Sequence, residues 1–200
     1  MNLLTDKLPY SVLIDGEEYA INTDFRVAVR FEILLFNPEL TDEEKAWKAL
    51  ELFYPVIPDN VEEAFEKINW FYSGVKEEGG SSEKSEIGYS YENDSEYIYA
   101  AFLDQYRIDL QREDLHWWTF KALFKALKED CDFVKIMGYR TIKITNDMSK
   151  EDKEFYKKMK KQYALPKRIS KSEQDRRKAL EEILLNGGDV QEFLKGDDSN

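Results

Sequence analysis

Leu115-His116-Trp117-Trp118-Thr119-Phe120-Lys121-Ala122-Leu123 is the stretch on which the predicted fold depends. It lies in a helix that we predict from Glu113 to about Lys128, with apolar side chains around most of its circumference. The polar side chains fall mainly on a narrow stripe, formed by Lys121, Lys125 and Lys128. A helix with so wide an apolar arc is typical of the centre of a fold, because most of its surface must be covered. We therefore expect the other elements to pack around it.

The N-terminal part of the chain predicts a β-hairpin. Asp15-Gly16 separates two short apolar runs, which favours a two-residue type I′ turn that pairs Val12 with Tyr19. An isolated hairpin is only marginally stable in water, so we expect it to pack on the helices. The face predicted to make this contact carries Tyr10, Val12, Ile14, Tyr19 and Ile21.

Helices are predicted along most of the remaining chain. The helix predicted to start after Thr41 has an apolar face that includes Trp47 and Phe53. A shorter helix is predicted for residues 133–139. Residues 140–144 are interpreted as extended, and a charged helix runs from Ser149 to about residue 165. The residues predicted to cap helix starts are Thr23 or Asp24, Thr41, Asp59, Asn93 or Asp94, Ser149 and Ser170.

These patterns predict a mainly α fold with one domain, residues 1–166, on which the N-terminal hairpin packs. Residues 77–86 contain no apolar side chain, so we expect a flexible loop at about 75–88. The apolar patterns on both sides of this loop are able to share one core, and the loop therefore does not require a domain boundary. Residues 167–200 are predicted to form a charged, helical C-terminal appendage.

Composition excludes several classes of protein. No apolar run approaches the ~18 residues of a membrane span, and Met1 to Lys7 lacks the pattern of a signal peptide. With one Cys and one His, the chain has neither an intramolecular disulfide nor a Cys/His zinc cage. We therefore expect a soluble, acidic protein without a membrane partner.

Charge is distributed unevenly along the 200 residues, whose net charge is −12. Residues 1–110 carry 9 basic and 24 acidic side chains, whereas residues 150–178 carry 12 basic and 5 acidic ones. The basic stretch is a candidate for binding nucleic-acid phosphates. However, its aromatic residues Phe155, Tyr156 and Tyr163 also form the packing stripe of the helix. We favour a solvated helix, or one docked on the acidic half of the protein, and do not expect nucleic-acid binding.

No catalytic, cofactor or metal site is predicted. His116 is the only histidine and has apolar neighbours, which favours a packing or hydrogen-bonding role. Cys131 lies between Asp130 and Asp132, whose charges disfavour a thiolate. The sequence contains no phosphate-binding glycine loop, nucleophile elbow or EF-hand spacing. We therefore expect a protein that is not an enzyme and has no cofactor.

Two groups of apolar residues are candidates for protein interaction. Trp70 and Trp118 lie on otherwise polar helix faces, so they either anchor an interface or are covered by the hairpin or the 74–88 loop. The second group forms an apolar stripe near the C-terminus, which we expect to dock on a partner or on a neighbouring copy. It comprises Leu180, Ile183, Leu184, Val190, Phe193 and Leu194.

Several runs of the sequence resemble a family of tailed-phage proteins named for "gene product fifteen" of temperate siphophages. The resemblance extends from about residue 8 to residue 166, and its most specific element is His116-Trp117-Trp118. Other matching runs are Thr23-Asp24-Phe25-Arg26, Trp70-Phe71, Ile98-Tyr99-Ala100-Ala101-Phe102, Tyr106-Arg107-Ile108-Asp109-Leu110, Gly138-Tyr139-Arg140 and Tyr163-Ala164-Leu165-Pro166.

The resemblance implies a role in phage tail assembly. Genes of this family lie beside the tape-measure gene in tail modules, where chaperones of tail assembly are encoded. Such a chaperone coats the tape-measure protein in the host cytoplasm and is absent from the finished virion. The resemblance implies no catalytic residues, and the partners it implies are the tape-measure protein and other tail-module proteins. A structural virion component, such as a tail-completion or connector protein, is the alternative, and a homo-oligomer is compatible with either.

Overall fold

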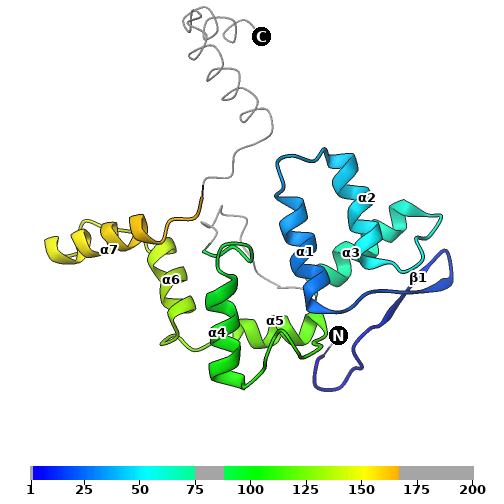
Figure 1. Cartoon of the computed structure of the whole chain (residues 1–200), viewed down its shortest axis with the longest axis horizontal. Helices are drawn as coiled ribbons and strands as arrows, with labels where there is room; N and C mark the ends of the chain where they lie inside the picture. The colour runs from blue at the N-terminus through cyan, green and yellow to red at the C-terminus, as the bar shows by residue number, and fades with distance from the viewer. Residues whose placement is uncertain (1, 75–87, 167–200) are drawn as a thin grey trace, which may run out of the picture.

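The computed structural model describes residues 2–74 and 88–166 (Figure 1). The predicted loop at about 75–88 and the predicted appendage at 167–200 therefore lie almost entirely outside the described residues. The described part is mainly α, as predicted. Its elements are β1 (Ser11–Ile14), β2 (Glu17–Ala20), α1 (Phe25–Leu35), α2 (Asp42–Phe53), α3 (Val61–Ser73), α4 (Ser95–Tyr106), α5 (Trp117–Lys125), α6 (Asp132–Thr141) and α7 (Lys150–Gln162).

Strands β1 and β2 form the predicted hairpin, with Val12 opposite Tyr19. Asp15 and Gly16 have φ angles of 50° and 82°, as a type I′ turn requires. Val12 and Ile14 are buried against the helices, which confirms the predicted packing face for these residues. The prediction is wrong for Tyr10, whose side chain is 63% exposed and reaches the core only through an edge contact with His116.

Contacts with the hairpin turn fix the residue that caps the N-terminus of α3. Asn60, rather than the predicted Asp59, caps this helix by accepting a hydrogen bond from the backbone N–H of Glu63. The side-chain amide of Asn60 also donates to the Asp15 carboxylate, while Glu63 accepts from the backbone N–H of Asp15. A contact between the hairpin turn and the helix, separated by 45 residues, thus decides which residue is the cap.

Helix α5 lies at the centre of the fold, as predicted, but it begins at Trp117 instead of Glu113. The residues before it are held extended by short antiparallel pairing with the chain that precedes α1. The backbone N–H of Phe25 donates to the oxygen of Leu115, and that of Trp117 donates to the oxygen of Thr23. This long-range pairing takes the place of the first helical turn that the sequence pattern favours.

The core is rich in stacked aromatic rings centred on Phe120 of α5, whose side chain is 1% exposed. Its ring stacks on Phe25 of α1 at 4.7 Å and on Phe102 of α4 at 4.9 Å between ring centroids. Because Phe120 links α1, α4 and α5, segments on both sides of residues 75–87 contribute to one buried cluster.

Helices α6 and α7 form one end of the molecule, where α7 projects beyond α6 (Figure 1). The predicted extended conformation of residues 140–144 is wrong for Arg140 and Thr141, which form the last turn of α6. Helix α7 starts after the predicted cap Ser149 but ends at Gln162, three residues earlier than predicted. Among the described residues, no helix is long and apolar enough to cross a membrane.

Candidate protein-interaction site

Trp70 occupies the last turn of α3 and is 45% exposed, as expected for an aromatic residue on a polar helix face. Its ring meets the ring of Trp118 edge-on, with a distance of 5.5 Å between centroids and an interplanar angle of 68°. Trp70 is therefore an exposed aromatic side chain whose orientation is supported by a second indole from α5.

Trp118 is only 3% exposed, so of the two alternatives that the sequence left open for this residue, the covered side chain is the one observed. Its indole N–H donates to the backbone oxygen of Phe71 at 2.7 Å, and its ring stacks on the ring of Phe71. Tertiary packing against α3 has covered this side chain, whereas the sequence pattern alone left it on a polar face. Trp118 supports the exposed Trp70 and does not itself offer a surface.

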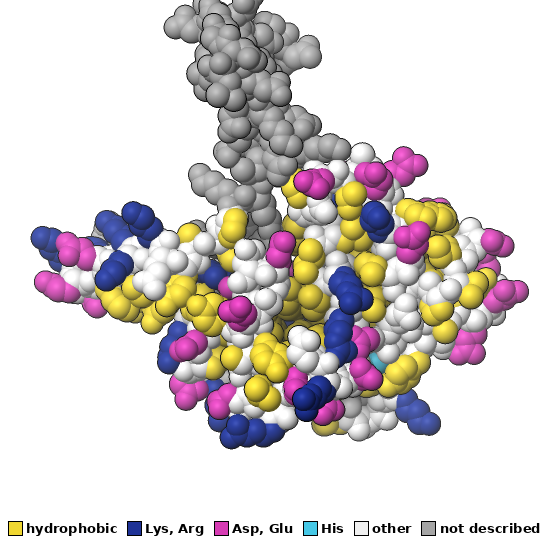
Figure 2. Space-filling model, in the orientation of Figure 1, with side chains coloured by type: hydrophobic (Ala, Val, Ile, Leu, Met, Phe, Trp, Pro, Cys, Tyr) yellow, Lys and Arg dark blue, Asp and Glu magenta, His cyan; other side chains and the backbone are white. Residues whose placement is uncertain are grey.

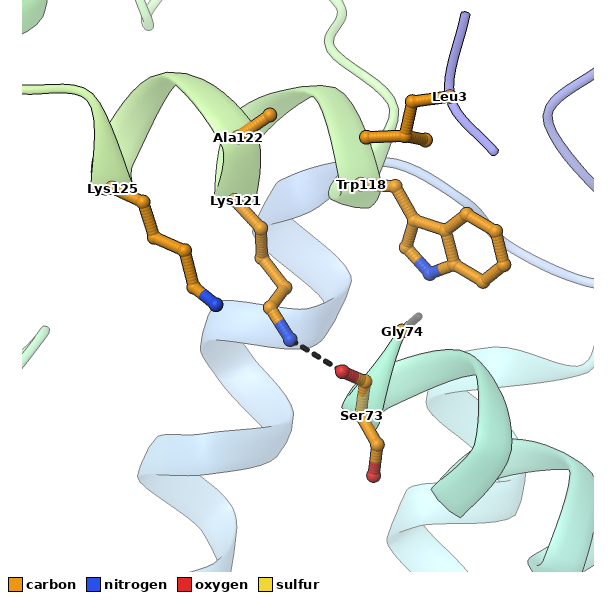
Figure 3. A pocket seen from close by; sticks show the side chains of 7 residues that line it. All are labelled: Leu3, Ser73, Gly74, Trp118, Lys121, Ala122 and Lys125. Carbon is orange, nitrogen blue, oxygen red and sulfur yellow. Dashed lines mark hydrogen bonds between the residues drawn. The ribbon is translucent and has the colours of Figure 1, made fainter. Parts of the chain in front are cut away.

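Two residues of the predicted lysine stripe, Lys121 and Lys125, lie in α5, whereas Lys128 follows its end, and Lys121 reaches the C-terminal end of α3 (Figure 3). The ammonium group of Lys121 donates to the backbone oxygens of Tyr72 at 3.3 Å and Ser73 at 2.6 Å. These are among the last carbonyl groups of α3, which lack partners within the helix and attract positive charge. Lys121 therefore stabilises the end of the helix that carries Trp70.

A pocket of about 260 Å³ lies beside this contact. Figure 3 shows Leu3 on the opposite side of the Trp118 indole from the end of α3. Gly74 ends α3 with a φ of 72°, a conformation that glycine adopts without strain. The pocket is lined by Leu3, Ser73, Gly74, Trp118, Lys121, Ala122 and Lys125.

His116 performs the hydrogen-bonding role that the sequence predicts. Its Nδ1 accepts from the backbone N–H of Trp118, so the ring caps α5, and its Nε2 donates to the backbone oxygen of Pro9 at 2.9 Å. Burial lowers the pKa of His116, and the hydrogen bond to Pro9 opposes this effect. A neutral imidazole fits both contacts, because protonation would remove the Nδ1 acceptor.

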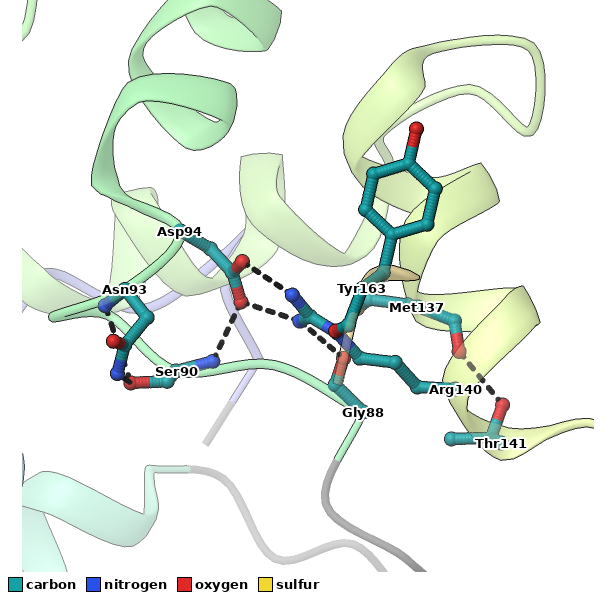
Figure 4. A network of polar contacts seen from close by, with 8 residues as sticks. All are labelled: Gly88, Ser90, Asn93, Asp94, Met137, Arg140, Thr141 and Tyr163. Atoms are coloured by element: carbon teal, nitrogen blue, oxygen red, sulfur yellow. Dashed lines mark hydrogen bonds and ion pairs between the residues drawn. The ribbon is translucent and has the colours of Figure 1, made fainter. Parts of the chain in front are cut away.

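A buried ion pair that the sequence analysis missed joins α4 to α6 (Figure 4). Arg140 donates to both carboxylate oxygens of Asp94 at 2.6 and 2.7 Å, and the Asp94 side chain is 1% exposed. Asp94 is the predicted cap of α4, but its carboxylate binds the N–H of Ser90 instead of the helix end. Nothing in a single sequence pairs two residues 46 positions apart, although Arg140 lies in a run that carries the family resemblance.

One predicted part of the site lies outside the described residues, and one side chain that the sequence pattern placed in the packing is exposed. The stripe residues Leu180, Ile183, Leu184 and Phe193 lie outside residues 2–74 and 88–166. Trp47 is 53% exposed on α2, although the sequence pattern placed it on a packing face. Within the described ranges, no group of three His, Cys, Asp or Glu side chains is arranged to hold a metal ion.

Comparison with models of protein families identifies a family for this chain. A family model described as Bacteriophage Gp15 protein matches residues 4–165, which is most of the chain and includes every described helix. No curated protein and no solved structure matches. The matched residues include those of the Trp70–Trp118 contact and the Asp94–Arg140 ion pair. The chain therefore belongs to the bacteriophage Gp15 protein family, which indicates a structural or tail-related phage protein without known enzymatic activity.

Proposed function

We propose that this protein is a non-enzymatic chaperone or scaffold of phage tail assembly, and that it binds the tape-measure protein through a surface that includes Trp70. The observation that carries the proposal is the half-exposed indole of Trp70, held edge-on by the buried indole of Trp118. Aromatic side chains of this kind often contribute most of the binding energy at protein interfaces.

The support around Trp70 lowers the cost of binding. The ring of Trp118 is fixed by its hydrogen bond to Phe71, and Lys121 holds the end of α3. A side chain that is already oriented loses little conformational entropy when a partner covers it. The expected partner surface is the apolar face of a long helical protein, packed against the exposed edge of Trp70.

The charge of the protein fits this role. A long helical partner exposes apolar faces before the tail tube forms around it, and such faces promote aggregation. The net charge of −12 gives the complex a repulsive surface that keeps it dissolved. The complex would form in the host cytoplasm during assembly, before the virion is complete.

Co-expression with the tape-measure protein of the same phage tests the proposal. We expect a soluble complex that co-purifies at low and moderate salt, and failure to co-purify at both would contradict the proposed function. Trp70→Ala should weaken binding by about 30-fold, the effect of losing a typical interface anchor. Trp47→Ala is the matched control, because Trp47 is also a half-exposed tryptophan but lies on α2. Equal losses in the two variants would show that Trp70 is not the contact.

Purified phage particles distinguish this role from that of a structural virion component. A chaperone leaves before the particle is finished, so mass spectrometry of particles should detect none of this chain. Its presence in stoichiometric amounts would instead support a tail-completion or connector protein.

A further inference from the structure

The structure has a groove between α1 and α4 that the function proposed above does not use. Its volume is about 360 Å³, and Figure 2 shows a hollow between these helices with an apolar floor and basic side chains on its α1 side. The aromatic and aliphatic side chains of the floor come from α1, α4, α5 and the segment after α4. The lining residues are Phe25, Arg26, Val29, Arg30, Tyr91, Ser95, Ile98, Tyr99, Leu110, Gln111 and Phe120.

The walls of the groove are held in place by hydrogen bonds. Arg26 of α1 donates to the backbone oxygens of Leu110 at 2.7 Å and Glu113 at 2.9 Å, which ties α1 to the segment between α4 and α5. The Tyr99 hydroxyl of α4 donates to the Asp109 carboxylate at 3.0 Å. Because both walls are fixed in this way, a ligand would enter the groove without first ordering it.

The charge of the groove favours an acidic ligand. Its lining includes Arg26 and Arg30 but no acidic residue. The guanidinium of Arg26 pairs with Asp24 at 2.7 Å and with Asp114 at 3.4 Å, so its charge is largely compensated. Arg30, one turn further along α1, forms no ion pair with any residue that the structure describes. Arg30 is exposed at the groove and is therefore available to a carboxylate from outside the described region.

The chain leaves the described region close to this groove. The backbone oxygen of Tyr163 accepts a hydrogen bond from Nε of Arg140 at 2.6 Å, and the same guanidinium binds Asp94 (Figure 4). Asp94 immediately precedes Ser95, which lines the groove. The described chain continues only to Pro166, three residues after Tyr163. Residues 167 onwards therefore start near the α4 wall.

We propose that the groove binds the chain's own residues 179–185, Ala-Leu-Glu-Glu-Ile-Leu-Leu. In this arrangement Leu180, Ile183 and Leu184 of a helical segment meet the apolar floor, Glu181 lies beside them at the basic α1 wall, and Glu182 faces away from the groove. Residues 179–194 contain four acidic and no basic side chains, so their charge is complementary to that of the groove. A helix that presents apolar residues at i, i+3 and i+4 is a common ligand of an apolar groove.

The connecting segment is long enough for this contact. Twelve residues, the number from 167 to 178, span at most about 40 Å, and a random coil of twelve residues has an average end-to-end distance of about 20 Å. Tethering gives the segment an effective concentration near the millimolar range, so even a weak contact is well populated. Binding within one chain is therefore favoured over binding of a second copy at ordinary protein concentrations.

Photo-crosslinking in the full-length protein tests the proposal without the tape-measure protein. The photoreactive residue benzoylphenylalanine replaces Gln111, an exposed residue of the groove lining, and replaces Lys48 on α2 in the control. We expect Gln111 to crosslink to a peptide containing residues 179–185 in a product of monomer mass, and Lys48 to give no such product. Absence of this product, or a tail crosslink found only at dimer mass, would overturn the proposal.

A charge exchange gives a second, independent test with the same crosslinking assay. Arg30→Glu should reduce the crosslink yield roughly threefold or more at low salt, and adding Glu181→Lys should restore it. Lys48→Glu is the control, because Lys48 is exposed on α2 and does not line the groove. An unchanged yield in Arg30→Glu, or a failure of the exchange to restore the yield in folded protein, would contradict the assigned contact. Neither result depends on whether the tape-measure protein is the partner.

Discussion

The aromatic core around α5 and the α6–α7 end of the molecule are stabilised in different ways. Phe120 is buried among stacked rings from several helices, whereas none of the residues of α7 is buried. Helix α7 contacts α6 through ring contacts of Tyr139, and the Arg140–Asp94 ion pair joins α6 to α4. The stabilisation from apolar burial grows with the buried area and does not depend on the orientation of the groups. A buried ion pair, in contrast, becomes destabilising when one of its two charged partners is removed. The two regions should therefore respond differently to substitution.

The largest difference is expected for phenylalanine truncation. Phe120→Ala should lower the free energy of unfolding by about 4 kcal/mol, because it removes a fully buried ring and leaves a cavity. Phe155→Ala on α7 should cost less than about 1 kcal/mol, since that side chain is 47% exposed. Urea denaturation followed by circular dichroism measures both values, and similar costs would refute the contrast between the regions.

Loss of the buried ion pair should have the next largest effect. Arg140→Leu should lower the free energy of unfolding by about 3 kcal/mol, because it leaves the buried Asp94 carboxylate without its charge partner. Amide hydrogen exchange should also increase in α6 and α7 more than in α5. Adding Asp94→Asn, which keeps an acceptor for the N–H of Ser90, should recover much of the stability. No recovery in the double variant would mean that the unpaired charge is not the cause.

The two glycines at helix positions should give opposite changes. Gly74→Ala should destabilise the protein by about 2 kcal/mol, because its φ of 72° and ψ of −159° are strained for any residue with a Cβ. Gly138→Ala in α6 should stabilise the protein by about 0.7 kcal/mol, since a Cβ there meets no atom within 4 Å and alanine favours a helix. Thermal unfolding compares the two variants. A stabilising Gly74→Ala would contradict the strained conformation.

The smallest effect is expected from the pH dependence of His116. Burial lowers the pKa of this side chain in the folded protein, whereas the unfolded chain titrates near 6.5. Below about pH 6.5 the unfolded state therefore binds more protons, and stability should fall with decreasing pH by no more than about 1.4 kcal/mol per unit. His116→Asn retains a capping side chain for α5 and should lose this slope between pH 7.5 and 5.5. If the stability of the variant changes with pH as steeply as that of the unmodified protein, other titratable groups cause the pH dependence.

Much of the fold was predictable because it depends on local patterns. Asp15-Gly16 predicted the hairpin and its register, and Thr41 and Ser149 predicted two helix starts through their capping hydrogen bonds. These signals act over a few residues, so neighbouring sequence contains all of the required information. Errors occurred where a distant segment intervened, as at Asn60, which binds the hairpin turn, and at Trp117, which pairs with the chain before α1.

The candidate site was predictable only in part. The polar surroundings of Trp70 in its helix made it a candidate for an exposed ring without deciding between exposure and coverage, and the ring is 45% exposed. The same reasoning left both alternatives open for Trp118, which is covered, because the end of α3 packs on it and accepts its indole hydrogen bond. Whether an aromatic residue on a polar face is exposed depends on which element packs there, and helical periodicity does not contain that information.

The sequence by itself determined the mainly α fold, the hairpin, the central position of α5 and the absence of familiar catalytic motifs. These follow from hydrophobic periodicity, from the residues at turns and from which motifs are present, all of which are read within short segments of the sequence. The tertiary structure alone decided that Trp70 is exposed over a buried Trp118, that Arg140 neutralises Asp94, and that Arg26 and Arg30 line a groove. Each of these features joins residues far apart in the chain, and their proximity arises only when the helices pack around one core.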